Sequence, residues 1–110
     1  MVTAELALGI PVLLSLTVGL VWLITIGVAQ VRMVDAARET ARAAARGDSQ
    51  PAAVAQGQRV ADGGVVTMST GHGQVVVTAS DEVPPPGGLL GFLPGVRVEA
   101  QAVTSVEVSR

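Results

Sequence analysis

The chain has no cysteine, no lysine and no tyrosine, and its only aromatic side chains are Trp22 and Phe92. Without cysteine, neither a disulfide framework nor a thiolate metal site can form. With so few aromatic residues, the core of any water-exposed part must be built from Val, Leu and Ala. We therefore expect that part to be thin and lightly packed.

Chemically useful side chains are also scarce. The formal net charge of −2 gives no reason to propose nucleic-acid binding. The sequence shows no nucleophile with a base, no phosphate-binding glycine loop and no metal-ligand cluster, and its single histidine, His72, falls in a predicted turn. We expect the protein not to be an enzyme and to bind no cofactor and no metal.

Charge is missing altogether from Leu6 to Ala29, a run of 24 residues. At about 1.5 Å per residue such a helix spans about 36 Å, enough for a bilayer core of about 30 Å. A buried core helix is the alternative, but the remaining chain is too small to cover it on all sides. We therefore predict a transmembrane helix over residues 1–30, kinked near Pro11, which lacks a backbone donor.

The orientation of this helix is not obvious from the sequence. The run is longer than the apolar region of a cleavable signal peptide, about 7–15 residues, and no basic residue precedes it. Arginines follow it, which by the positive-inside rule favours a cytoplasmic C-terminus: Arg32, Arg38, Arg42 and Arg46. A basic leader upstream of Met1 would reverse that orientation.

Residues 31–46 contain no Gly or Pro and predict an amphipathic continuation of the same helix. Their charged side chains fall within an arc of about 120°. The opposite face carries Val34, Ala37, Ala41, Ala44 and Ala45. One helix of about 40 residues would thus meet lipid first and then water and protein.

Residues 47–110 predict a small α+β domain. Gly47 suits a helix C-cap, and Ser49-Gln50-Pro51 starts a short helix whose inner face is Ala53, Val54, Gly57, Val60 and Ala61. A period of two then predicts a hairpin of strands 65–70 and 74–81 and a last strand over 96–108, giving a three-stranded antiparallel sheet. The loop between them holds Leu89, Leu90, Phe92 and Leu93, which should fold back on the domain or meet a partner.

A Glu at position five, an apolar helix, its amphipathic continuation and a small sheet together resemble type IV pilins and pseudopilins. Glu5 followed by Pro11 resembles the start of TadE-like proteins of the tight-adherence (Tad/Flp) pilus. The Ala/Arg stretch 35–46 resembles the next helix segment of that family. The Pro-Pro-Gly-Gly-Leu-Leu loop at 85–90 and the closing Val-rich strand resemble its actinobacterial branch.

The resemblance implies a pilin-like fold and a structural minor pilin or pseudopilin that takes part in pilus assembly from the cell membrane. It implies membrane lipid, other pilins and Tad assembly proteins as partners, and no nucleic acid. A prepilin peptidase would cut before Met1 if a leader exists. The C-terminal domain would be extracytoplasmic, in the membrane or in a surface pilus, and Glu5 would serve subunit pairing.

Two alternatives stay open at the level of sequence. Taken alone, Glu5 is explained as an interfacial acid that the positive end of the helix dipole favours. The alternative function is a single-pass membrane anchor or regulator that holds a partner protein through the sheet or the Leu-rich loop.

Overall fold

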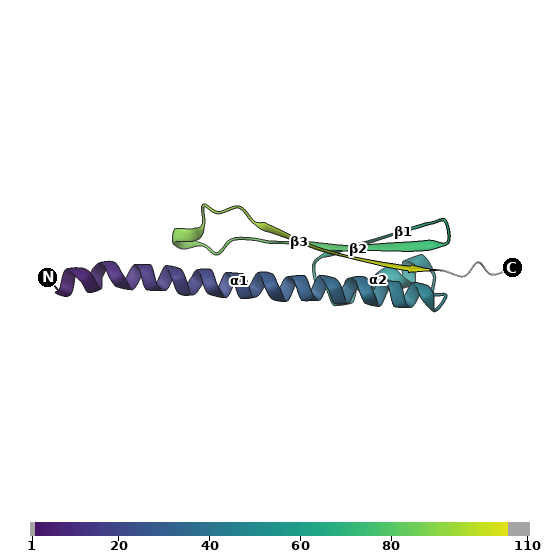
Figure 1. Cartoon of the computed structure of the whole chain (residues 1–110), viewed down its shortest axis with the longest axis horizontal. Coiled ribbons are helices and arrows are strands. Elements are labelled where there is room, and N and C mark those ends of the chain that lie inside the picture. The colour runs from purple at the N-terminus through teal and green to yellow at the C-terminus, as the bar shows by residue number, and fades with distance from the viewer. Residues whose placement is uncertain (1, 106–110) are drawn as a thin grey trace.

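The computed structural model describes residues 2–105, which form a narrow rod about 19 Å across. The longest element is one helix, α1 (Val2–Ala45, 44 residues), about 66 Å long at about 1.5 Å per residue, and every other element lies along it (Figure 1). The predicted α+β fold, with one unbroken long helix, is confirmed. Helical structure continues through Pro11; the bend expected there stays a prediction.

The long helix ends where the sequence predicts. Gly47 has a left-handed φ of +96°, and its N–H donates to the Ala44 carbonyl at 3.1 Å, while the Asp48 N–H reaches the Ala43 carbonyl at 3.1 Å. This pair of bonds is the Schellman motif, which satisfies carbonyls left without a partner at a helix end.

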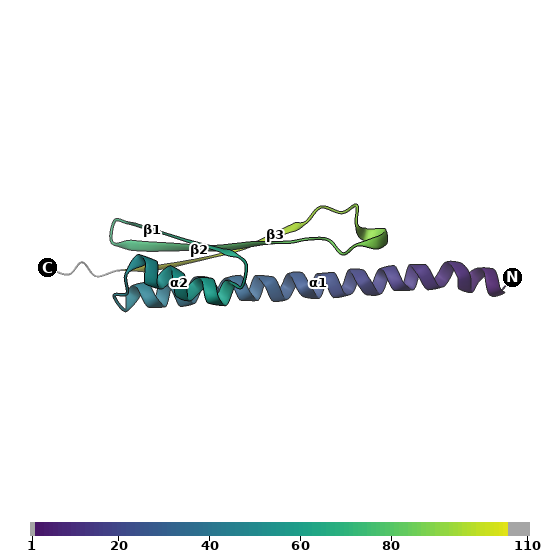
Figure 2. The ribbon, with the colours of Figure 1, turned by 180° about the vertical axis from the view of Figure 1, so that it is seen from behind.

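The chain then turns back along the end of α1 as α2 (Gln50–Ala61), seen most clearly from behind (Figure 2). The Ser49 side chain caps α2 by accepting a hydrogen bond from the Ala52 N–H at 3.3 Å. On the side facing α1, Ala53, Gly57 and Ala61 are buried, as the sequence predicts, and Val54 and Val60 are half-buried beside them. These small side chains let the two helices approach closely.

The covered face of α1 differs in part from the predicted one. Ala37, Ala41 and Ala44 are buried as expected, but Val34 is only half-buried and Ala45 is exposed. The burial extends instead to residues that the charge pattern did not single out: Met33, Ala36, Thr40 and Ala43. The reason is that α2 and the sheet cover α1 from two sides, so the buried arc is wider than the gap between charged residues suggests.

The sheet is antiparallel in the order β1-β2-β3 and consists of β1 (Val65–Gly71), β2 (Gln74–Val83) and β3 (Val96–Ser105). The predicted strands are confirmed, with β2 two residues longer than expected. The predicted extension of the last strand to Val108 lies outside the described residues. Burial alternates along β2 and β3, as it does where one face packs on a core and the other meets solvent.

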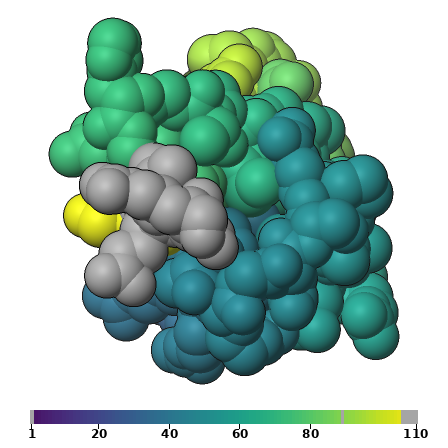
Figure 3. Space-filling model, turned by 90° about the vertical axis from the view of Figure 1, so that its right-hand side faces the viewer, coloured from purple at the N-terminus to yellow at the C-terminus, as the bar shows by residue number. Residues whose placement is uncertain are grey.

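A two-residue turn joins β1 to β2 at the end of the rod farthest from the N-terminus. His72 (φ +53°) and Gly73 (φ +75°) both adopt the left-handed conformation that a type I′ hairpin turn requires. Viewed from that end, the hairpin (green) lies over the two helices (blue to teal) (Figure 3). His72 is exposed there, so its place in a turn is confirmed.

The sheet packs its inner face on the second half of α1. Val66, Val75, Val77 and Ala79 are buried in this core together with Met33, whose side chain is fully buried. Gln30 adds a polar tie, because its Nε2 donates to the Glu99 carbonyl at 3.0 Å. The fully buried core therefore lies alongside the part of α1 that follows residue 28, with Trp22 and Ile26 partly buried at its edge.

Candidate functional site

The first half of α1 is an apolar surface that the rest of the chain leaves largely uncovered. In its most apolar 18-residue window only 6% is buried. Leu8, Leu13 and Ile24, which lie about one to four turns apart, are 74%, 62% and 66% exposed. Apolar patches of this size are rare on monomeric soluble proteins. The helix is long and apolar enough to cross a membrane once, and this exposure separates it from the core helix of a soluble domain.

Two threonine hydroxyls in this half are satisfied locally, whereas the buried Trp22 Nε1 has no hydrogen-bond partner in the described part of the chain. The Thr17 hydroxyl donates to the Leu13 carbonyl and the Thr25 hydroxyl to the Val21 carbonyl, each at 2.9 Å. Hydroxyls bonded to their own helix bring no unpaired donor into lipid. This helix can therefore face hydrocarbon on all the sides that the protein leaves open.

Glu5 is the one charged side chain before Arg32, and it lies exposed in the first turn of α1. Among residues 2–105 it faces no cation of the same subunit at ion-pair distance. A carboxylate here is favoured by the positive end of the helix dipole. It is also free to pair with a group outside the described part of the chain, including one from another subunit.

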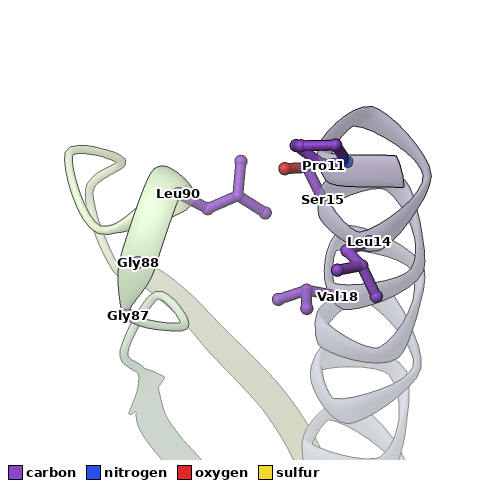
Figure 4. Close-up of a pocket in the computed structure, with 7 residues that line it drawn as sticks. All are labelled: Pro11, Leu14, Ser15, Val18, Gly87, Gly88 and Leu90. Atoms are coloured by element: carbon purple, nitrogen blue, oxygen red, sulfur yellow. The ribbon is translucent and has the colours of Figure 1, made fainter. Parts of the chain in front are cut away.

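A second feature of the apolar half is a groove between α1 and the loop that joins β2 to β3. The sequence predicted that this loop could fold back on the domain, but not the groove. The connection between β2 and β3 contains a short 3-10 helix, η1 (Gly88–Leu90), which lies beside the N-terminal half of α1 (Figure 1). Leu90 points toward α1, and its Cδ1 is 3.7 Å from the position that a Cβ on Gly19 would take (Figure 4). The open groove has a volume of about 290 Å³ and is lined on the helix side by Pro11, Leu14, Ser15 and Val18.

Beyond the apolar half of α1, charged side chains of the helix and the sheet lie at the same position along the rod. Arg32 of α1 lines a second groove together with Asp81 and Glu82 of β2. Glu82 is paired in register with Arg97 of β3. On the N-terminal side of this level, α1 has no charge as far as Glu5, and the loop between Glu82 and Arg97 has none at all.

This apolar helix is also the part of the chain that a known family matches. Residues 1–42 match the family model described as TadE-like protein. This segment of the chain is therefore similar to TadE-like proteins. The match confirms the resemblance drawn from Glu5, Pro11 and the Ala/Arg stretch, and it ends before α2 and the sheet. No curated protein and no solved structure matches the chain significantly. The assignment to the actinobacterial branch stays a prediction.

The TadE-like helix carries both residues that the sequence singled out, and the structure does not bring them together. Glu5 and Pro11 lie six residues apart, and only Pro11 borders the groove. The assembly role of Glu5, the bend at Pro11 and a cleavage before Met1 are untested, and Met1 lies outside the described residues. Among residues 2–105, no cluster of three potential metal ligands occurs.

Sequence reasoning missed how far the β2–β3 connection reaches along the TadE-like helix. Its apolar residues were expected to fold back or to meet a partner, and Leu90 does fold back. Phe92, however, is 79% exposed, so this large apolar side chain is not buried against the rest of the domain. The available signal was the length of the uncharged stretch between Glu82 and Arg97, which parallels the uncharged run of α1.

Proposed function

We propose that this TadE-like chain is a structural minor pilin or pseudopilin that takes part in assembling a Tad/Flp-type pilus from the cell membrane. The observation that carries the proposal is the family match over a helix whose apolar half is left uncovered by its own domain. Such a helix can exchange lipid for neighbouring helices of the same kind. The 19 Å width of the rod suits side-by-side packing of subunits.

Glu5 is the residue to which we assign subunit pairing. In a single subunit the carboxylate can stay in the headgroup region at little cost. In a bundle of such helices it enters a drier setting, where an unpaired charge costs several kcal/mol and a cation offsets that cost. The partner that we propose is the α-amino group of a neighbouring subunit.

The proposal places the α2 and sheet domain outside the cytoplasm, with other pilins, Tad assembly proteins and membrane lipid as partners. A leader that stays in the cytoplasm and is cut by a prepilin peptidase would give this orientation. The domain would then remain at the membrane or enter a surface pilus with its helix.

The test is substitution of Glu5 in cells that make the pilus. We expect Glu5→Gln and Glu5→Ala to leave the protein abundant and membrane-inserted but to reduce its co-purification with the major pilin and the number of surface fibres. Glu39→Gln is the matched control, because it makes the same chemical change near the other end of the same helix, where Glu39 pairs with Arg42 at 3.4 Å.

Unchanged association and fibre number in both Glu5 variants, at wild-type protein levels, would remove the assembly role. That result would favour the alternative of a single-pass anchor or regulator of a partner protein, which has no reason to need a carboxylate at this position.

A further inference from the structure

We infer that the β2–β3 loop, residues 83–96, is a second membrane-contacting element that dips into the lipid leaflet on the domain's side, next to α1. The inference rests on α1 crossing the membrane but not on a pilin role. Its occupant is lipid hydrocarbon, which would surround Phe92 and fill the groove between η1 and α1.

The depth of the loop follows from the position of η1 along the helix. With Glu5 at one interface, a hydrocarbon core of about 30 Å spans about 20 residues and ends near Thr25. Leu90 lies opposite Gly19, six residues closer to the N-terminus than Thr25. At about 1.5 Å per residue, Leu90 lies about 9 Å inside the boundary of the hydrocarbon core at Gly19, and the groove that it lines extends deeper, as far as Pro11. Segments that bind membrane interfaces reach about 5–10 Å, so this loop reaches at least the deep end of that range.

The charge pattern agrees with this depth on both segments. Arg32, Asp81 and Glu82 lie together at one level, about 10 Å beyond Thr25 on the domain side, where headgroups and water are. From that level toward the membrane, neither the helix nor the loop carries a charge until Glu5. A loop that remained in water would have no reason to lose its charges over the same stretch.

Backbone polarity sets the limit of insertion. Unpaired N–H groups are costly in hydrocarbon, so irregular loops rarely enter it. Four prolines remove donors from this loop: Pro84, Pro85, Pro86 and Pro94. Two further donors are satisfied internally, since the Gly91 N–H bonds the Gly88 carbonyl and the Leu93 N–H bonds the Leu90 carbonyl, both at 3.1 Å. The donors that remain favour a shallow position over one at the bilayer centre.

Side chains on both sides of the loop suit lipid as the surrounding medium. Phe92 is 79% exposed, which is a poor arrangement in water and a favourable one in acyl chains. Trp22 lies opposite Pro86, and its Nε1 is buried with no hydrogen-bond partner. Trp is frequent near membrane interfaces, and Trp22 is three residues inside the boundary drawn at Thr25.

The absence of cysteine from the chain allows a direct test with single cysteines. Phe92→Cys reports on the loop, Ser69→Cys is an exposed, nearly isosteric control on β1, and Leu16→Cys reports on the transmembrane helix. The full chain is reconstituted at low density in vesicles of equal parts phosphatidylcholine and phosphatidylglycerol. A charged maleimide is introduced on both faces by freeze–thaw, and labelling rates are compared with those after denaturation in SDS.

We expect Cys at position 92 to react at least about tenfold more slowly than Cys at position 69, because the reactive thiolate does not form in an apolar medium. A fluorophore attached at position 92 should be quenched by lipids spin-labelled near the headgroup more than by lipids labelled at the chain end. The same fluorophore at position 69 should be quenched by neither.

Three results would overturn the inference, and they are distinguishable. If position 92 reacts as fast as position 69 while position 16 is protected, the helix is inserted and the loop is in water. If position 92 is protected but no lipid quenches its fluorophore, protein covers the loop. If position 16 also reacts quickly, α1 does not cross the membrane. The first two outcomes leave the proposed pilin function standing, whereas the third removes its basis as well.

Discussion

Gly57 is the position where the packing of α2 on α1 is most sharply testable. A Cβ placed on Gly57 would overlap the Thr40 Oγ1 and would lie 3.2 Å from both the Thr40 Cβ and the Ala36 carbonyl oxygen. Thr40 is fully buried, and its hydroxyl donates to the Ala36 carbonyl at 2.9 Å. Neither the side chain nor the backbone opposite Gly57 has room to move aside.

The expected cost of Gly57→Ala follows from two opposing effects. Alanine gains about 1 kcal/mol over glycine in a helix interior. Overpacking a closed core costs about 1–3 kcal/mol, and we take about 3 kcal/mol because one of the atoms met is backbone. The net effect is about 2 kcal/mol of destabilisation, so the opening equilibrium of α2 should shift by about 30-fold, given tenfold per 1.4 kcal/mol.

Hydrogen–deuterium exchange of the full chain in detergent micelles measures this opening, since amide protection reports the local free energy of unfolding. Amides of α2 should exchange about 30-fold faster in Gly57→Ala than in the wild type. Gly27→Ala is the matched control, because it adds the same methyl group to α1 where no atom lies within 4 Å. It should leave α2 unchanged.

A second variant identifies the cause of the effect. Adding Thr40→Ala to Gly57→Ala removes the overlapping hydroxyl and should restore most of the α2 protection. If Gly57→Ala alone leaves α2 as protected as in the wild type, the two helices are not in the close contact described, and the argument from small side chains fails.

Two further predictions concern the join between α2 and β1 and the orientation of the domain. Gln58 accepts a hydrogen bond from the Val66 N–H at 2.6 Å and donates one to the Gly64 carbonyl at 2.9 Å. Gln58→Ala should therefore cost about 2 kcal/mol of stability and speed amide exchange at the start of β1, whereas Gln58→Glu, which keeps the acceptor, should cost about half as much. Equal amide protection in the wild type and both variants would contradict this role. A reporter that is active only outside the cytoplasm, fused after Arg110 and expressed from the native gene, should be active. Its inactivity at normal expression would restore the cytoplasmic orientation that the arginine count favours.

The local structure of this protein was largely predictable because the relevant signals are short-range. The uncharged run and the Ala/Arg stretch specify one long helix, since no Gly or Pro interrupts residues 28–46. Gly47, Ser49 and the His72-Gly73 turn mark element ends through their own backbone preferences. The similarity to TadE-like proteins also depends on a continuous segment, residues 1–42, and needed no tertiary information.

What the sequence by itself determined is therefore the set of elements, their order and the apolar character of the first helix. Only the tertiary structure decided how wide the buried face of α1 is, because two elements cover it at once and Thr40 and Met33 are buried by their combined geometry. The structure alone also placed η1 beside Gly19, since the reach of a loop depends on how β2 and β3 lie along α1 rather than on the loop's own residues. Periodicity describes each element's own faces, whereas the contacts between elements distant in the sequence depend on how all of them pack together.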